Sequence, residues 1–162
     1  MHLNTLTTDK EKKLWVTHSY GETIMVEKRG KSIIFHSNAL LNEQHFIVQH
    51  FIRNFSHASW TTAPLFDGYA IDDQQLYIIG KDWPEELLLQ ENALILLKNN
   101  PTVNLERLIK KHSPKMVIID GSNTPYYIGR WTISLEKSKT PYHITSTMGA
   151  YALSAKTWSE GF

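Results

Sequence analysis

Residues 115–125 read KMVIIDGSNTP, and this stretch decides the fold class. Its first part predicts a strand buried on both faces, because an uninterrupted apolar run is typical of a central strand in a parallel sheet. Thr124 and Pro125 then predict the start of a helix, since threonine is a good N-cap and proline fits the first helical position. Trp131 and Leu135 belong to an apolar stripe along that helix. A buried strand that turns directly into an amphipathic helix indicates an α/β domain.

The segments on either side of this stretch repeat the alternation of strand and helix. We expect a buried strand at Ala93–Leu97 and a short helix at Asn104–His112 before it. After the helix that begins at Pro125, short strands are expected at Tyr142–Ile144 and Met148–Ser154. The second half of the chain therefore predicts two successive βαβ units.

The first half of the chain predicts antiparallel strands and one helix. Two runs rich in Ile, Val and Phe, Glu22–Glu27 and Lys31–His36, are separated by a glycine-containing turn and indicate a hairpin. The preceding run Leu14–His18 adds a third strand to the same sheet. Asn42–Phe55 has the spacing of an amphipathic helix. Together with the βαβ units, this pattern predicts an α/β fold of mixed β-sheets with flanking helices.

Residues 56–73 show neither helical nor strand periodicity, so we expect a loop there before a strand at Gln75–Ile79. The chain has no internal repeat, low-complexity tract or linker, which predicts one domain over residues 14–154. Residues 1–13 are expected to form a disordered N-terminal arm and residues 155–162 a C-terminal tail. No apolar run approaches the ~20 residues that a membrane-spanning helix needs.

Composition and charge exclude several classes of protein. The 162 residues carry 17 Lys plus Arg against 16 Asp plus Glu, a formal net charge of +1, which provides no strong field for a polyanion. The absence of cysteine excludes disulfides, thiolate zinc sites and cysteine nucleophiles. The eight histidines show no spacing typical of metal ligands, and the scattered glycines form no phosphate-binding loop. We therefore expect neither a metal nor a nucleotide cofactor.

The turn after the central strand is the candidate ligand or turn site. Open α/β sheets place ligands at the carboxyl end of a central strand, beside a helix N-terminus. The candidate residues are Asp120, Ser122, Asn123, Thr124, Tyr127 and Arg130. The turn lacks the second glycine of a G-x-S-x-G nucleophile elbow, so we expect no catalytic residue and a structural role for Asp120. A carboxylate that accepts backbone N–H bonds beside a helix N-terminus should have a lowered pKa.

Four segments carry a resemblance to a known family. They are ALILLKNNPT at 93–102, KMVIIDGSNT at 115–124, the closing segment 141–153, and the opening hairpin at 20–35. The first three look like the C-terminal extracytoplasmic domain of the ComEC family, and the hairpin is similar to the one that begins the family's metallo-β-lactamase-like domain. The resemblance spans residues 14–154. It is strongest to members from the Bacteroidetes group, in which D-G-S-N is followed by an aromatic-rich helix.

The resemblance implies a degenerate, shortened metallo-β-lactamase-like fold, because the family's metal-ligand strings are missing. Intact members carry H-x-H-x-D-H after the first helix, and this chain has no such string. The H-H-G-S string falls on residues 99–102, so Asn99 and Asn100 occupy degenerate metal-site positions. The Y-G-H-P-H string falls on residues 124–131, which contain no histidine. Since zinc or manganese needs several converging ligands, the resemblance implies that the metal and the nuclease activity are lost.

The resemblance also implies a biological setting. ComEC proteins are polytopic inner-membrane proteins through which naturally competent bacteria take up single-stranded DNA. We expect this chain to be a metal-free accessory domain of such a protein that binds or docks rather than catalyses. Its expected partners are the membrane channel portion of the same protein or other competence proteins, with single-stranded DNA bound weakly. The expected location is a soluble domain of an inner-membrane protein facing the periplasm, with the cytoplasm as the alternative.

Two other functions stay open. A metal-independent hydrolase would use Asp120 and Ser122, and it would show a strongly perturbed acid in a deep cleft. A stand-alone protein-interaction module would instead expose an apolar patch. Candidate residues for that patch are Trp60, Phe66, Trp158 and Phe162.

Overall fold

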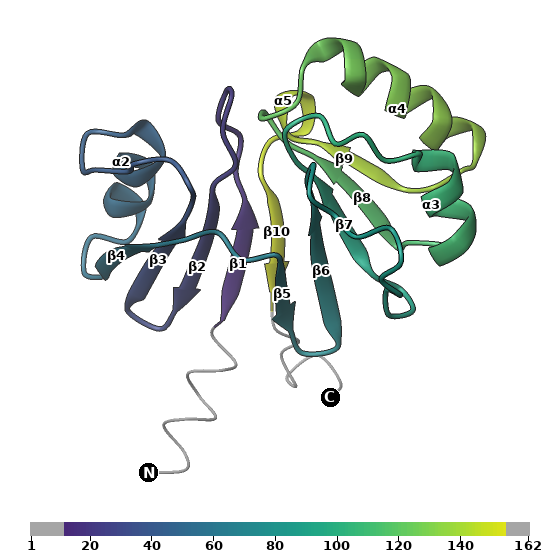
Figure 1. Ribbon diagram of the computed structural model, residues 1–162. Coiled ribbons are helices and arrows are strands. Elements are labelled where there is room, and N and C mark those ends of the chain that lie inside the picture. Colours follow the sequence, from purple (N-terminus) through teal and green to yellow (C-terminus); the bar gives the residue numbers. More distant parts are fainter. Residues whose placement is uncertain (1–11, 155–162) are drawn as a thin grey trace.

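Two five-stranded sheets lie at the centre of the computed structural model, which describes residues 12–154 (Figure 1). The first sheet has the order β10 (Tyr151–Ser154), β1 (Lys13–Val16), β2 (Met25–Arg29), β3 (Ser32–His36) and β4 (Ser59–Ala63). The second has the order β5 (Gly68–Ile71), β6 (Gln74–Ile79), β7 (Leu94–Leu97), β8 (Met116–Ile119) and β9 (Tyr142–Ile144). The helices are α2 (Phe46–Asn54), α3 (Leu105–His112), α4 (Pro125–Lys137) and the single turn α5 (Thr145–Met148).

The elements form four layers, with helices outside and sheets inside. Helix α2 covers the first sheet, whereas α3 and α4 cover the second, and the two sheets face each other (Figure 1). Each sheet contains both parallel and antiparallel pairs. The prediction of mixed sheets with flanking helices is therefore confirmed, and the arrangement is consistent with a shortened metallo-β-lactamase-like domain.

Three apolar clusters join the layers. Leu14 and Met25 of the first sheet meet Leu76 and Leu96 of the second, and this contact closes the space between the sheets. On the outer side of the first sheet, α2 buries a second cluster that includes Val26, Phe35, Val48 and Phe51. On the outer side of the second sheet, α3 and α4 bury a third cluster that includes Leu97, Ile119, Trp131 and Leu135. Strands β7 and β8 contribute to two clusters at once, which explains why their sequences are continuously apolar.

Strand direction gathers the candidate residues at one end of the molecule. Strands β6 to β9 are parallel, so their carboxyl ends share one edge of the second sheet. The β1–β2 loop meets them there, because the backbone N–H of Gly21 donates to the carbonyl of Gly121 at 2.8 Å. We call this region the loop end; it comprises residues 17–24, 98–104 and 120–124 and helix α5.

Residues 56–73, which the sequence predicted as a loop, contain the strands β4 and β5. Strand β4 pairs in parallel with β3, and β5 pairs in antiparallel with β6. Both are edge strands, and the first four residues of β4 are exposed. An edge strand with little burial shows no apolar alternation, which is why the sequence pattern missed it.

Some predicted element boundaries are also wrong. The helix predicted over Asn42–Phe55 begins only at Phe46, because His45 is its N-cap and its Nδ1 accepts the N–H of Ile47 at 3.2 Å. The strand predicted over Met148–Ser154 begins at Tyr151, because the turn of α5 ends at Gly149 with a φ of 82°.

The two predicted terminal segments lie mostly or wholly outside the described residues. The predicted arm over 1–13 lies outside the described residues except for its last two, and the predicted tail over 155–162 lies wholly outside them, as do Trp158 and Phe162. Among residues 12–154, none of the helices has the length and apolar character needed to cross a bilayer.

A substitution at Gly121 tests the contact between the two sheets at the loop end. A Cβ on Gly121 would overlap the carbonyl oxygen of Ser19 and lie 2.9 Å from Cε1 of His18, whereas a Cβ on Gly129 in α4 would meet nothing. We expect Gly121→Ala to lower the free energy of unfolding by about 2 kcal/mol or more through this overlap. The matched change Gly129→Ala should raise it by up to about 1 kcal/mol, because it improves helix propensity. Urea unfolding of both variants checks this, and equal stabilities would show that the two loops do not pack this closely.

Candidate functional site

The turn after β8 is held by a hydrogen-bond network around one carboxylate. Oδ1 of Asp120 accepts the backbone N–H of Ser122 at 3.2 Å and the Ser122 hydroxyl at 2.5 Å. The Ser122 hydroxyl oxygen in turn accepts the backbone N–H of Asn99 at 3.0 Å. The turn after β8 and the loop after β7 are therefore joined through a single serine.

Asparagine side chains join the same two loops a second time. Nδ2 of Asn123 donates to the carbonyl of Leu97 at 2.7 Å, and its Oδ1 accepts the N–H of Asn100 at 2.8 Å. Oδ1 of Asn100 accepts the N–H of Thr124 at 2.8 Å and its hydroxyl at 3.3 Å. Thr124 is at the N-cap of α4 as predicted, but its side chain makes no capping bond to the helix. The hydroxyl bonds to Asn100 instead.

Asn99 and Asn100 also shape the loop through their backbones. Their φ angles are 55° and 50°, in the left-handed region that asparagine tolerates better than most residues. The positions that the resemblance assigns to lost metal ligands thus lie beside the Asp120 turn and brace it.

Asp120 is the most unusual group in this network. It is 1% exposed, and its Oδ2 finds no hydrogen-bond partner among residues 12–154. Burial raises the pKa of the Asp120 carboxyl, although the bonds from Ser122 and the nearby Thr23 and His18 oppose the shift. The lowered pKa expected from the sequence is wrong. The turn supplies only one backbone N–H, and the β1–β2 loop seals the carboxylate from water, so the cost of desolvation dominates.

Tyr127 and Arg130 do not join the turn. The ring of Tyr127 packs against Trp131, with centroids 5.5 Å apart, as part of the cluster under α4. Arg130 is exposed and lies over the ring of Tyr126 at 5.7 Å. Of the six candidate residues, the structure therefore brings together Asp120, Ser122, Asn123 and Thr124 only.

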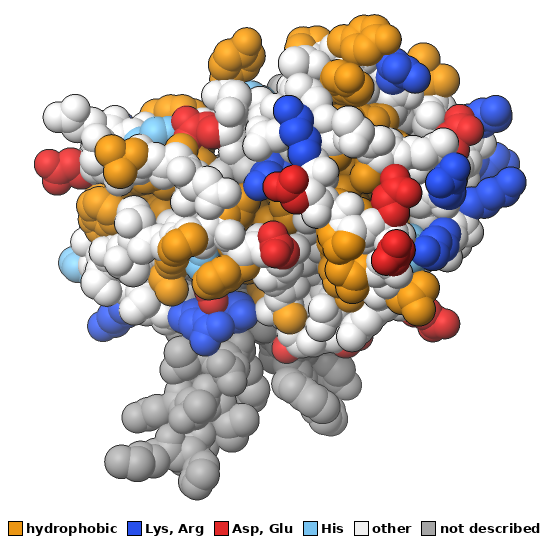
Figure 2. Space-filling view, in the orientation of Figure 1, with side chains coloured by type: hydrophobic (Ala, Val, Ile, Leu, Met, Phe, Trp, Pro, Cys, Tyr) orange, Lys and Arg blue, Asp and Glu red, His pale blue; other side chains and the backbone are white. Residues whose placement is uncertain are grey.

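An open cleft lies on the solvent side of the network. It is lined by Ser122, Asn99 and Asn100, and by charged and aromatic side chains that include Lys81, Asp82, Trp83 and Lys98. In the middle of the face seen in Figure 2, acidic side chains lie beside basic ones, and basic side chains gather toward its right-hand side. The cleft therefore offers polar contacts of both charges and no concentrated positive field.

The histidines of residues 12–154 lie at separate places in the structure. Nδ1 of His18 lies 3.0 Å from the hydroxyl of Thr145, and Nε2 of His45 lies 3.2 Å from a carboxylate oxygen of Glu22. Within the described part of the chain, no group of three or more His, Asp and Glu side chains could hold a metal ion. Each of these histidines pairs locally with a neighbouring loop or helix instead.

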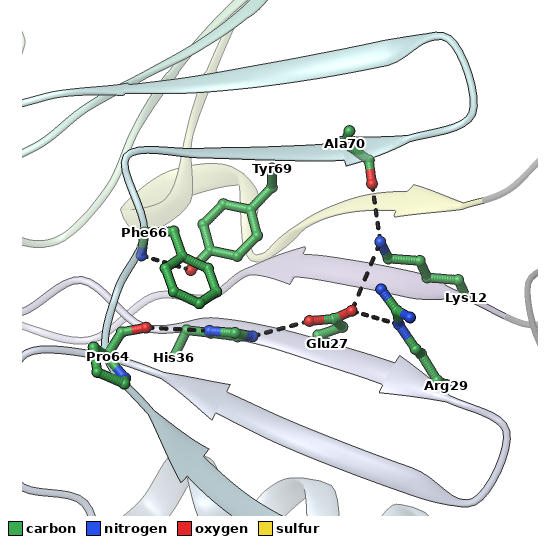
Figure 3. Close-up of polar contacts among 8 residues, drawn as sticks. All are labelled: Lys12, Glu27, Arg29, His36, Pro64, Phe66, Tyr69 and Ala70. Atoms are coloured by element: carbon green, nitrogen blue, oxygen red, sulfur yellow. Dashed lines mark hydrogen bonds and ion pairs between the residues drawn. The ribbon is translucent and has the colours of Figure 1, made fainter.

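A second polar cluster is centred on Glu27 (Figure 3). Oε2 of Glu27 lies 2.9 Å from Nε2 of His36, and Oε1 accepts Nε–H of Arg29 at 2.7 Å. The hydrogen bond to His36 is the largest cause that lowers the pKa of Glu27 to about 2, against the opposing effect of burial. Lys12 lies 3.7 Å from the same carboxylate and donates to the carbonyl of Ala70 in β5 at 2.9 Å. The cluster therefore ties the first sheet to the second.

The sequence pattern did not identify the pairing of His36 with Glu27. In the register of the hairpin, Glu27 lies opposite Ile34 and His36 lies opposite Met25. Glu27 and His36 are thus diagonal neighbours on one face of the sheet. Nδ1 of His36 also lies 3.3 Å from the carbonyl of Pro64, in the segment that crosses between the sheets. A hairpin register worked out residue by residue is the signal that would have paired them.

Comparison with known proteins gives one match. The family model described as ComEC C-terminal domain matches residues 14–155, which is most of the chain. No curated protein and no solved structure gives a match.

The pKa shift of Asp120 predicts an unusual pH dependence. Because the folded-state pKa lies above the unfolded value, stability from this group is present at low pH and is lost as the pH rises through the folded-state pKa. Asp120→Asn keeps an acceptor for Ser122 and removes the buried charge, so we expect it to gain stability relative to the parent as the pH rises above the usual carboxyl value of 3.8. Asp120→Ala should lose about 1–3 kcal/mol at these pH values. Urea unfolding at several pH values measures this, and parallel curves for parent and Asp120→Asn would contradict it.

The lowered pKa of Glu27 predicts the opposite dependence of stability on pH. Its folded-state pKa of about 2 lies below the usual 4.5, so its stabilisation is present above about pH 4.5 and is lost as the pH falls through about 2. We expect Glu27→Gln to lower the free energy of unfolding by about 2–3 kcal/mol at neutral pH, and the difference from the parent to shrink in acid. Glu86→Gln, at an exposed residue, is the control and should follow the parent. A pH-independent difference between parent and Glu27→Gln would contradict this assignment.

Proposed function

Because this chain belongs to the ComEC C-terminal domain family, we propose that it serves a ComEC-type DNA-uptake protein as a metal-free domain that docks rather than catalyses. One observation carries the proposal. At the positions where the resemblance places imidazole ligands, the Asn100 side chain accepts two bonds from Thr124, and the Asn100 N–H donates to Asn123. An amide oxygen already engaged in bracing two loops has little capacity left to coordinate a metal.

The proposal includes a setting and partners. The domain faces the periplasm and contacts the membrane portion of the same protein or other competence proteins. Single-stranded DNA binds it weakly, since the formal net charge is +1 and charges of both signs share the face in Figure 2. We further assign it to the Bacteroidetes type, on the D-G-S-N string at residues 120–123, and treat residues 14–154 as one domain.

A metal-independent hydrolase is the second candidate, and one observation favours it. Asp120 is a buried acid with a raised pKa, its Oδ1 accepts the Ser122 hydroxyl, and Ser122 lines the open cleft. A serine bonded to a carboxylate is the start of a nucleophile–base pair. However, the Ser122 hydroxyl also accepts the Asn99 N–H, which commits one of its lone pairs to the loop, and the residue is only 9% exposed. This bonding favours a structural serine.

Metal content and hydrolysis of the purified chain test the proposal. We expect no stoichiometric zinc, manganese or iron by elemental analysis, and no cleavage of single- or double-stranded DNA when zinc or manganese is added. In a naturally competent host, replacing this domain in the full-length protein by a flexible linker should lower transformation frequency, whereas Asp120→Asn should not. One tightly bound metal per chain, with DNA cleavage lost on chelation, would overturn the metal-free role. Hydrolysis without metal that disappears in Ser122→Ala but persists in Thr124→Ala would establish the second candidate.

A further inference from the structure

The outer face of the first sheet is covered by a helix over only part of its width. Val26 of β2 and Phe35 of β3 are fully buried beneath α2. The same row of side chains continues through Trp15 of β1 to Ala152 of β10, since Trp15 is the register partner of both Val26 and Ala152. Trp15 is only partly buried, and Ala152 is exposed. Among residues 12–154, α2 therefore covers the outer face of β1 only in part and leaves that of β10 uncovered, whereas the second sheet carries both α3 and α4.

A groove runs along this part of the face, between α2 and the strands β1 and β10. Its floor is aromatic: the ring centroid of Trp15 lies 5.1 Å from that of Phe51 and 6.2 Å from that of Phe55. Its far side is formed by Ala150, which precedes β10, and Ala152 of β10 lies beyond this lining as the register partner of Trp15. Small side chains there let another element approach the sheet closely, and the aromatic floor gives it apolar surface to bury.

Arg53 of α2 brings a positive charge to the lining of this groove, and no Asp or Glu of the described residues is part of that lining. His18 and His50 also line it. Lys13 and Lys28 are register partners one row further along the same face, and Nζ of Lys28 lies 5.0 Å from the centre of the Phe55 ring. An occupant with acidic groups at its edges would therefore find complementary charge on α2 and on the strands.

We propose that this groove docks an amphipathic helix whose apolar stripe is flanked by acidic residues. Two strands span about 10 Å, which is about the diameter of one helix. A helix in this position would lie beside α2, cover Trp15 and Ala152, and complete the outer layer of the first sheet. Trp15 would be the central apolar contact, and Arg53 would pair with the acidic edge.

Single-stranded nucleic acid fits the groove less well. Stacking of bases needs free ring faces. Phe51 is 6% exposed, and Trp15 and Phe55 pack against it and each other. Phe46 is 57% exposed, but its ring stacks on His45 with centroids 4.8 Å apart. The rings thus form a continuous apolar floor rather than a series of separate stacking platforms. This inference rests on the proposed docking role, since it names the class of partner that is docked.

Two synthetic peptides test the groove. Both are helical peptides of about five turns with a leucine stripe, flanked by glutamates in one and by lysines in the other. Fluorescence anisotropy should show that the purified chain binds the glutamate-flanked peptide at least about tenfold more tightly. Ala152→Glu should weaken this binding about tenfold, whereas Ala70→Glu, the same change at an exposed residue of edge strand β5 in the other sheet, should leave it unchanged. Arg53→Glu should shift the preference toward the lysine-flanked peptide.

Three results would overturn the inference. The first is equal affinity for both peptides, or no binding of either, and the second is an Ala152→Glu variant that binds like the parent. The third is displacement of the bound peptide by a single-stranded oligonucleotide at similar concentration, which would make the groove a nucleic-acid site. None of these outcomes decides the metal-free role, because metal content and DNA hydrolysis are measured separately. Conversely, a bound metal with chelator-sensitive hydrolysis would overturn the proposed function while the peptide preference could still hold.

Discussion

The close approach of the β1–β2 loop to the turn after β8 is the constraint on which the loop end depends. The N–H of Gly21 donates to the carbonyl of Gly121, and only a glycine at 121 leaves room for Ser19. This contact closes one end of the space between the sheets and removes Asp120 from water. Because the Asp120 carboxylate is removed from water, its hydrogen bonds to Ser122 are stronger than they would be in solvent. The bond between Asn100 and Asn123 holds the neighbouring loop to the same turn.

The sequence predicted the elements whose patterns arise from burial. Strands β7 and β8, the stripe of α4 and the N-terminal hairpin follow directly from apolar runs and periodicity. Strand β4 was missed because a parallel edge strand is specified by its pairing with β3 rather than by its own side chains. The pKa of Asp120 was misjudged for a related reason: desolvation comes from residues about a hundred positions earlier in the chain, which a local motif does not contain.

The asparagines of the loop after β7 hold it in place through both backbone and side chain. Asn99 and Asn100 adopt left-handed backbone angles, the Asn100 N–H donates to Asn123, and the Asn100 side chain accepts from Thr124. A metal ion holds loops by binding several side chains at one point. Here the same connection is distributed over separate hydrogen bonds. These hydrogen bonds keep the loop end defined through side chains of the chain itself.

The pairing of β1 with β10 has a mechanical consequence. Lys13 and Ser154 are register partners at the same end of an antiparallel pair, so the two sides of the described chain leave the sheet next to each other. Tension applied across these two points would break the hydrogen bonds between β1 and β10 one after another, rather than loading all of them at once in shear. A domain of this topology resists little force between its own ends.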